Sequence, residues 1–261
     1  MSVREKITRY YSGTDGAEVA AKLMDAAELV NKNRKYKVSD FLDPYGLSIA
    51  ETIIAHFPNL KFTAEGGYFG AERQRGAIVH EDFLGEIEYG LTVVAVTWND
   101  KYHNLAHRDV LGSILGLGIS RDVVGDILLR NDHCKIILTK EIFPFVLQNL
   151  TQISNAGVSV AEGELSQIEP KEERCKEIKT TIASLRLDAV AAAGFGVSRS
   201  KISNDIEADK VKVNWQPAKS SSQVIKESDI VSMRGRGRIE IEEIRGQTKK
   251  GRISIVLKRF I

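Results

Sequence analysis

The sequence predicts an α+β protein in three parts: a mostly helical N-terminal region, a middle unit of element order β-α-β-β-α-β, and a C-terminal unit of two helices followed by strands. Apolar runs that alternate with amphipathic stretches indicate the middle unit, and two short helical segments before several strand-like runs indicate the last. Charge is also sorted along the chain. Residues 171–261 hold 20 Lys and Arg against 12 Asp and Glu, whereas residues 1–170 hold 17 against 23. A basic C-terminal block on a mildly acidic body indicates a nucleic-acid module.

Length and composition are those of an ordinary globular protein. The 261 residues, 43% hydrophobic and 28% charged, leave room for two or three compact domains. No apolar run approaches the roughly 20 residues that span a bilayer, and the first residues lack the apolar stretch of a signal peptide. Cys134 and Cys175 lie in no ligand-like pattern. We therefore expect a cytoplasmic monomer without a disulfide, metal, other cofactor or membrane segment.

The N-terminal domain is expected over residues 1–85. Apolar residues recur at helical spacing over residues 16–31, and Asp43-Pro44 is a typical start for a second helix. In the stretch EGGYFGAERQRG, Gly66-Gly67 predicts a turn. We place the boundary to the next domain near residues 82–88.

The middle domain is expected over residues 86–166. Its order of elements is that of the ferredoxin-like, or RRM-like, fold, in which two helices cover one face of an antiparallel sheet. The expected elements are a strand at 91–99, a helix at 107–118, two strands joined by a turn at Asn131-Asp132, a helix at 140–153 with Pro144 in its first turn, and a strand at 157–165.

Such sheets bind single-stranded RNA when their central strands expose aromatic side chains. The two strands around Asn131-Asp132 carry none, and only Trp98 and Tyr102 lie near the first strand. We therefore expect this domain to act through its shape or through a protein contact, with direct stacking on RNA as the open alternative.

A charged linker, which could become helical, is expected over residues 167–182, and the C-terminal domain over residues 183–261. Two short helices precede the strand candidates KVKVN, DIVSMRGRGRIEIEEI and RISIVLKRF. Ser198 is a favourable N-cap for the second helix, yet Arg199 and Lys201 follow it in the first turn, where the helix dipole opposes positive charge. A bound phosphate would reverse the sign of that interaction.

The concentration of basic residues in this unit predicts an RNA-binding surface. Glycines between arginines in RGRGR let guanidinium groups approach a phosphate chain closely. The expected RNA-binding residues are Arg186, Ser198, Arg199, Lys201, Lys210, Lys212, Asn214, Arg234, Arg236 and Arg238. Secondary contacts are expected at Arg73, Arg75, His107 and Arg108.

The stretch RLDAVAAAGFGVSRSKISNDIEADKVKVN resembles the RNA-binding "S-four" domain. The matching residues are Arg186-Leu187-Asp188, Ser198-Arg199 and Val211-Lys212-Val213-Asn214. The usual glycine before the strand is replaced by Asp209-Lys210, and the usual glycine after Asn214 is Trp215. The resemblance implies a grip on structured RNA by the second helix and the following strand.

GGYFGAERQR and HRDVLGSILGLGISRDVVGDI, followed by this C-terminal unit, resemble the YlmH family of bacterial proteins, which are encoded beside cell-division genes. The resemblance implies a factor that binds the large ribosomal subunit and acts with peptidyl-tRNA when stalled, split ribosomes are rescued. Its implied partners are rRNA and tRNA, with rescue factors or division proteins as further candidates. We therefore expect a non-catalytic role in ribosome-associated quality control.

Enzymatic alternatives have weaker support. HRD at 107–109 lacks the other protein-kinase motifs, and we expect Asp109 near a helix start with His107 and Arg108 just outside it. His103 and His107 lack a third metal ligand nearby. Pseudouridine synthases use an aspartate nucleophile in an Arg-Leu-Asp motif, as around Asp188, but place a catalytic domain of about 200 residues after the S-four domain. A division-protein adaptor that needs no RNA is the other alternative.

Overall fold

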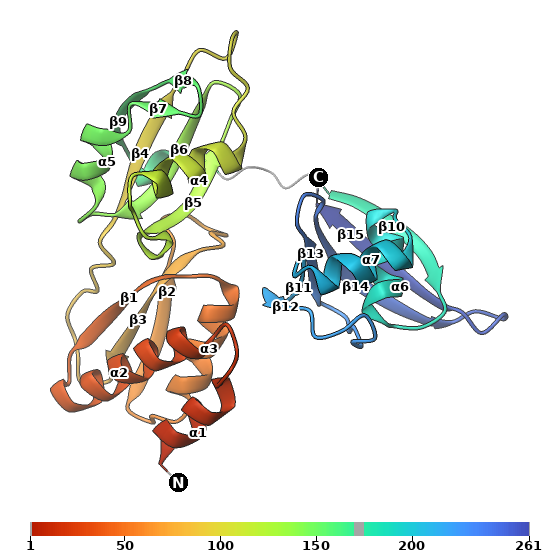
Figure 1. Cartoon of the computed structure of the whole chain (residues 1–261). Coiled ribbons are helices and arrows are strands. Elements are labelled where there is room, and N and C mark those ends of the chain that lie inside the picture. The colour runs from red at the N-terminus through yellow and green to blue at the C-terminus, as the bar shows by residue number, and fades with distance from the viewer. Residues whose placement is uncertain (1, 170–174, 261) are drawn as a thin grey trace. The chain divides into compact units, whose positions relative to one another are not determined.

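The computed structural model describes residues 2–169 and 175–260. The chain forms two compact units, Met1–Lys171 and Glu172–Ile261, which are described separately (Figure 1). Within the described ranges, no helix is both long and apolar enough to cross a membrane.

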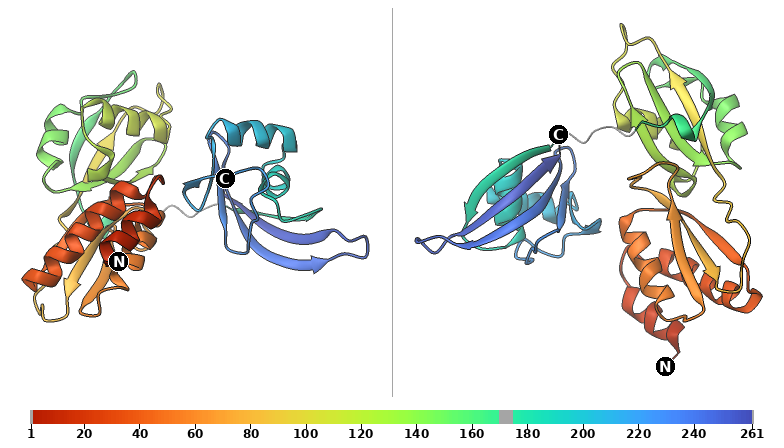
Figure 2. Two further views of the ribbon diagram at one scale, coloured as in Figure 1. Left: turned by 60° about the horizontal axis from the view of Figure 1, so that its bottom comes forward. Right: turned by 180° about the vertical axis from the view of Figure 1, so that it is seen from behind.

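The N-terminal part of the first unit packs helices on one face of a three-stranded antiparallel sheet with strand order β1-β3-β2 (Figures 1 and 2). The second expected helix begins as predicted, because the Asp43 side chain accepts a hydrogen bond of 2.8 Å from the Gly46 amide and Pro44 lies in the first turn. Ile49 and Ile53 on this helix and Ile78 on the sheet are buried in the shared core. The elements are α1 (Val3–Tyr11), α2 (Ala17–Asn33), β1 (Tyr36–Leu42), α3 (Pro44–Ile54), β2 (Leu60–Glu65) and β3 (Gln74–His80).

The middle part confirms the ferredoxin-like expectation. Its four long strands form an antiparallel sheet of order β5-β6-β4-β9, and two helices cover one face. The two helices pack on the sheet through Val110, Ile114 and Val146, which are buried in the shared core. The elements are β4 (Leu91–Thr97), α4 (His107–Gly116), η1 (Arg121–Val123), β5 (Val124–Leu129), β6 (His133–Thr139), α5 (Phe143–Asn149), β7 (Gln152–Ile153), β8 (Ala156–Gly157), β9 (Ser159–Gly163) and η2 (Leu165–Gln167).

The opposite face of the middle sheet is covered within the same unit. Val93 on β4 and Ile137 on β6 are fully buried against Phe41 of β1 and against Ile168, which follows η2. Trp98 is buried on the helix side, so it offers no stacking platform. The central part of this sheet therefore lacks the open aromatic face that single-stranded RNA requires.

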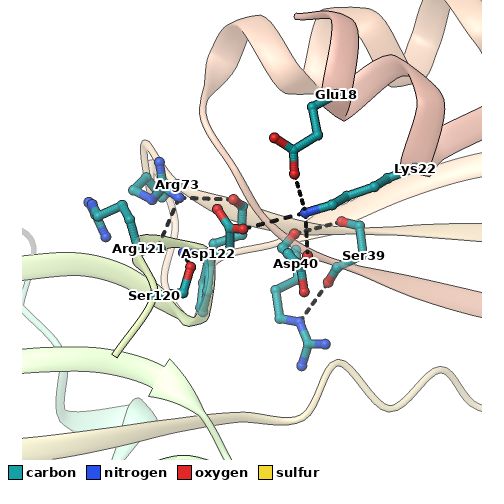
Figure 3. A network of polar contacts seen from close by, with 10 residues as sticks. Glu18, Lys22, Ser39, Asp40, Arg73, Ser120, Arg121 and Asp122 are labelled. Carbon is teal, nitrogen blue, oxygen red and sulfur yellow. Dashed lines mark hydrogen bonds and ion pairs between the residues drawn. The ribbon is translucent and has the colours of Figure 1, made fainter. Parts of the chain in front are cut away.

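A network of polar contacts joins the two parts of the first unit (Figure 3). Lys22 on α2 lies 3.1 Å from Glu18, 3.8 Å from Asp40 and 3.5 Å from Asp122 of η1. The Arg73 guanidinium donates to the carbonyl of Phe41 at 2.9 Å and to that of Val124 at 3.1 Å. Burial, together with the nearby Arg73 charge, lowers the pKa of Arg121 to about 10.

The second unit is a six-stranded sheet of order β10-β15-β14-β13-β11-β12 with two helices on one face (Figures 1 and 2). Leu187, Val190 and Ile202 on the helices are fully buried against Ile239 and Leu257 on the strands. The elements are β10 (Cys175–Ile182), α6 (Leu187–Phe195), α7 (Arg199–Glu207), β11 (Val211–Val213), β12 (Gln216–Pro217), β13 (Ile230–Met233), β14 (Gly237–Gln247) and β15 (Ile253–Phe260).

The linker predicted over residues 167–182 is wrong in its second half. Residues 175–182 form β10, which pairs with β15 along its whole length from Cys175–Phe260 to Ile182–Ile253. Because β10 is an edge strand, half of its eight residues are exposed and only one is buried, and charged residues are common on such edges. The charge that suggested a linker is therefore compatible with a strand. Residues 170–174 of the predicted linker lie outside the described residues.

Candidate nucleic-acid interface

The two helices of the second unit are positioned by their caps. Gly196 ends α6 in the left-handed conformation with φ of 67°, and Ser198 begins α7, as predicted, by accepting a hydrogen bond of 3.2 Å from the Lys201 amide. Arg199 and Lys201 therefore do lie in the first turn of α7. Two buried carboxylates offset this unfavourable placement.

The first carboxylate is Asp188, in the first turn of α6, with 5% of its surface exposed. It accepts hydrogen bonds from Arg186 Nε at 3.2 Å and from Arg199 Nη2 at 2.7 Å. Burial opposes ionisation of Asp188, but the hydrogen bonds from Arg186 and Arg199 outweigh it and hold the pKa below its ordinary value. We call Arg186, Asp188 and Arg199 the arginine clamp.

The second carboxylate is Asp205, one helical turn after Lys201. Its oxygens lie 3.3 Å from Lys201 Nζ and 3.5 Å from Lys210 Nζ. Burial opposes ionisation here too, but the hydrogen bond and charge of Lys201, followed by those of Lys210, hold the pKa of Asp205 below its ordinary value. Each aspartate thus orders two cations and leaves one positive charge in excess.

A basic hollow of about 870 Å³ opens beside Asp205, at the end of the sheet. The turn between β13 and β14 contributes Arg234 and Arg236, which make no ion pair among the described residues, and the Arg234 amide donates to the Lys210 carbonyl at 2.9 Å. The charged lining residues are Lys201, Asp205, Lys210, Arg234, Arg236 and Arg259. The structure therefore brings four of the predicted RNA-binding residues together from three separate segments.

Arg259 is a basic residue of this hollow that sequence reasoning missed. In the register of the sheet it lies opposite Ile239, so its side chain points to the helix-covered face, with its guanidinium carbon 5.9 Å from the centre of the Phe195 ring. Its Nε is buried and makes no hydrogen bond within the described residues. The alternation of side chains along β15 could have indicated on which face of the sheet Arg259 lies, but it could not have indicated the basic hollow next to it.

Two predicted residues lie on the other face of the sheet. Lys212 and Arg238 both pair with Ser232, one from each side, and Val211 and Val213 on either side of Lys212 are buried. Neighbours across strands share a face, so Lys212 and Arg238 point away from the helices, and neither of them lines the basic hollow. The predicted surface is thus divided between two faces.

The comparisons with known proteins agree with this architecture. Residues 15–83 match the family model "YlmH, N-terminal", residues 85–167 match "Putative RNA-binding domain in YlmH", and residues 185–231 match "S4 domain". A protein of Bacillus subtilis (strain 168), "Ribosome-associated protein quality control protein P2", is 32% identical over 233 residues, which are 88% of this chain and 90% of that protein. The chain belongs to the YlmH family.

A solved YlmH structure shares part of the fold. "Cell division protein ylmH from Streptococcus pneumoniae" superposes with a TM-score of 0.51 over 59% of this chain and 95% of that chain, at 20% sequence identity. The S4 match of this YlmH-family chain ends at residue 231, so the arginines of the β13–β14 turn and Arg259 lie beyond it.

The two departures from the S-four pattern lie at strained turn positions of this YlmH-family member. Asp209, just after α7, has φ of 52°, and Trp215, in the turn between β11 and β12, has φ of 64°. Both conformations favour glycine. Between them, Asn214 accepts a hydrogen bond of 2.9 Å from the Ile230 amide and donates one of 2.8 Å to Asp229, so its predicted RNA contact competes with a role in the turn.

The four residues of this YlmH-family chain that were predicted to make secondary RNA contacts do not share one environment. The Arg75 guanidinium donates to the Ser39 carbonyl at 2.9 Å, and burial lowers the pKa of both Arg73 and Arg75. Both arginines therefore serve inside the first unit, and we leave them out of the proposed RNA surface. The prediction that His107 and Arg108 precede the helix is wrong, because they are the first two residues of α4; the Arg108 side chain is 90% exposed.

Proposed function

We propose that the chain is a non-catalytic RNA-binding factor of ribosome-associated quality control that docks on rRNA of the large ribosomal subunit and on peptidyl-tRNA. The observation that carries the proposal is the basic hollow, in which five cationic side chains surround one carboxylate. The name of the Bacillus relative supports the ribosomal setting. The name of the Streptococcus relative, a cell division protein, supports the cellular link to division.

The hollow suits a phosphate chain for two reasons. Arg234 and Arg236, which make no ion pair within the described ranges, carry planar guanidinium groups that bind phosphate oxygens in pairs. The two lysines of the hollow are held by Asp205 before any RNA arrives, which lowers the side-chain entropy lost on binding. Recognition by phosphates and shape fits the way double-stranded RNA is read.

A non-catalytic role is supported by the environment of Asp188. As the nucleophile of a pseudouridine synthase it would need a free carboxylate facing the substrate. Its two oxygens instead accept hydrogen bonds from Arg186 and Arg199, and its side chain is buried. Among the described residues, no three His, Cys, Asp or Glu side chains are grouped so that they could hold a metal.

The proposal is tested by sedimentation of the purified chain with large ribosomal subunits through sucrose at two salt concentrations. We expect comigration at low salt and its loss at high salt, because phosphate binding releases counterions. Free chain at the top of the gradient at both salt concentrations would refute the proposal. An RNA-modifying enzyme instead predicts a modified nucleoside in rRNA or tRNA that disappears when the gene is deleted, which mass spectrometry detects.

A division-protein adaptor is the second candidate, favoured by the name of the Streptococcus relative. An adaptor that needs no RNA would capture its division partner equally well after removal of the second unit, residues 172–261. The RNA-binding proposal predicts that the same truncation abolishes comigration with the large subunit.

A further inference from the structure

The loop between β2 and β3 holds one aromatic side chain in solvent. Phe69, in the stretch Gly66-Gly67-Tyr68-Phe69-Gly70, is 97% exposed, more than any other large apolar side chain among the described residues. Single exposed apolar residues are common on protein surfaces and need no explanation by themselves. Two further features distinguish this one: the rigidity of its loop and the hollow beside it.

The loop is fixed by one carboxylate of the middle part. Asp126 on β5 accepts hydrogen bonds from the Tyr68 hydroxyl at 2.8 Å, the Glu72 amide at 2.8 Å and the Arg73 amide at 3.1 Å. Gly66 allows the two ends of the loop to approach, since a Cβ there would lie 2.3 Å from the Ala71 side chain. Phe69 is therefore presented on a preorganised loop, which reduces the entropy lost when it binds.

A hollow of about 600 Å³ lies next to Phe69. Its apolar lining comes from Tyr68, Phe69, Tyr89, Leu91 and Leu165, and its charged lining from Glu65, Glu88 and Lys140. The Tyr89 hydroxyl is within hydrogen-bond distance of Thr63, at 2.7 Å, which orients the ring. An aromatic anchor beside an apolar hollow is typical of the energetic centre of a protein interface.

The charge around the hollow selects the partner. Residues 60–90 contain six Asp and Glu against three Lys and Arg. Two of those three cations, Arg73 and Arg75, point their guanidinium groups at backbone carbonyls of the first unit. With Lys140 counted, the charged residues that line the hollow are two exposed carboxylates, Glu65 and Glu88, against one exposed cation, so the rim is acidic on balance, which repels RNA phosphates and attracts a basic surface.

We propose that Phe69 and the hollow beside it are a docking site for a basic protein that presents an apolar side chain. Phe69 inserts into the partner, the partner's apolar side chain enters the hollow, and Lys or Arg side chains of the partner face Glu65 and Glu88. This inference rests on the proposed function, because that function places the basic partner on the large ribosomal subunit. The two units would then divide the work: the second binds RNA and the first binds protein.

The nature of the partner is tested by cross-linking. The full chain carrying the photoreactive p-benzoylphenylalanine in place of Phe69 is irradiated with purified large ribosomal subunits, and cross-linked protein is separated from cross-linked rRNA. We expect a cross-link to a Lys- and Arg-rich segment of a subunit protein. Cross-linking to rRNA, cross-linking to the chain's own second unit, or no cross-link would each overturn the docking site.

The energetic role of Phe69 is tested by substitution. We expect Phe69→Ala to raise the apparent Kd for the subunit at least fivefold without changing the melting temperature, because the side chain lies almost wholly in solvent. Leu84→Ala is the matched control: Leu84 is 95% exposed in the same unit but does not line the hollow, so its removal leaves the Kd unchanged. Equal affinities of the two variants would overturn the inference. Failure of the unsubstituted chain to sediment with subunits would refute the proposed function itself.

Discussion

Arg199 Nη2 in the first turn of α7 donates a hydrogen bond of 2.7 Å to Asp188 Oδ2 in the first turn of α6. A cation at the start of one helix is thus held by an anion at the start of the helix before it. Each charge has a favourable partner, and the anion also lies at the favourable end of its own helix dipole. The contact fixes the two helices that flank the proposed RNA-binding surface.

Asp188→Asn is therefore expected to destabilise the second unit. It removes the charge to which both Arg186 and Arg199 donate, and the loss should be about 1–2 kcal/mol, less than for a fully buried pair, because the two arginine side chains are 40% and 52% exposed. Urea unfolding in a Trp98→Phe background, where Trp215 alone reports, measures it. Glu207→Gln, an exposed neutralisation on α7, is the control and should change the free energy of unfolding little. A wild-type midpoint for Asp188→Asn would exclude the arginine clamp as a stabilising element.

Acid should weaken the second unit through Asp188 and Asp205. The pKa of each is lower in the folded chain than its ordinary value, so each stabilises the fold above the unfolded pKa of about 3.9, and that stabilisation is lost as pH falls through the folded pKa. We expect the free energy of unfolding to be flat near pH 6 and to fall below about pH 4. The double variant Asp188→Asn/Asp205→Asn should have a smaller slope in that range. An identical slope would show that other carboxylates carry the acid sensitivity.

Arg234→Ala/Arg236→Ala should weaken RNA binding more than tenfold at physiological salt and reduce the slope of log K against log salt by about 2. Neither arginine has an ion-pair partner among the described residues, so the melting temperature should not change. Lys249→Ala/Lys250→Ala, at the turn between β14 and β15, removes the same charge from the same unit far along the hairpin. Filter binding to large-subunit rRNA compares them. If the arginine and the lysine double variants weaken RNA binding equally, the net charge of the second unit determines the affinity and the basic hollow is not a specific binding site.

Asp209→Gly should stabilise the second unit by about 0.5–1 kcal/mol. Asp209 follows α7 with φ of 52°, where glycine avoids the steric cost of a side chain, and the change also removes a negative charge from the C-terminal end of the helix dipole. Asp209→Asn separates the two causes, since it removes only the charge. A thermal melt in which Asp209→Gly unfolds earlier than the unsubstituted chain would contradict this account of the turn.

The sequence predicted the elements whose signals are local. Ser198 as N-cap, Pro44 in the first turn of α3 and the β-α-β-β-α-β order of elements in the middle part all follow from short patterns and are confirmed. The sheet of the N-terminal part was not assigned, because β1 and β2 read as polar stretches with little burial and are edge strands of a three-stranded sheet. Their identity depends on pairing with β3.

The candidate site could not be predicted from the sequence alone, because its residues come together only in the folded chain. The spacing of Lys201 and Asp205 already allowed an i,i+4 ion pair, but Lys210 joins it through a turn, and Arg259 arrives from the last strand, 49 positions after it. The alternation of KVKVN could have separated Lys212 from its buried neighbours. It could not show that Lys212 lies outside the lining of the basic hollow.

The last prediction concerns Asp126, which links the N-terminal and middle parts of the first unit. Asp126 accepts its three hydrogen bonds with both oxygens, and the two backbone amides donate to different oxygens. In Asp126→Asn one oxygen becomes an NH₂ donor, so one of the two amides loses its partner and faces another donor. An unsatisfied donor of this kind costs about 1–3 kcal/mol, so the first unit should unfold at lower urea while the second unit does not change. Hydrogen exchange should increase at the amide of residue 72 or 73, whichever faces the new NH₂ group, before it increases in β5. Asp132→Asn, on the exposed turn between β5 and β6, is the control. If Asp126→Asn leaves exchange at these two amides at the wild-type rate, the loop is held by other contacts, and Phe69 does not depend on Asp126 for its presentation.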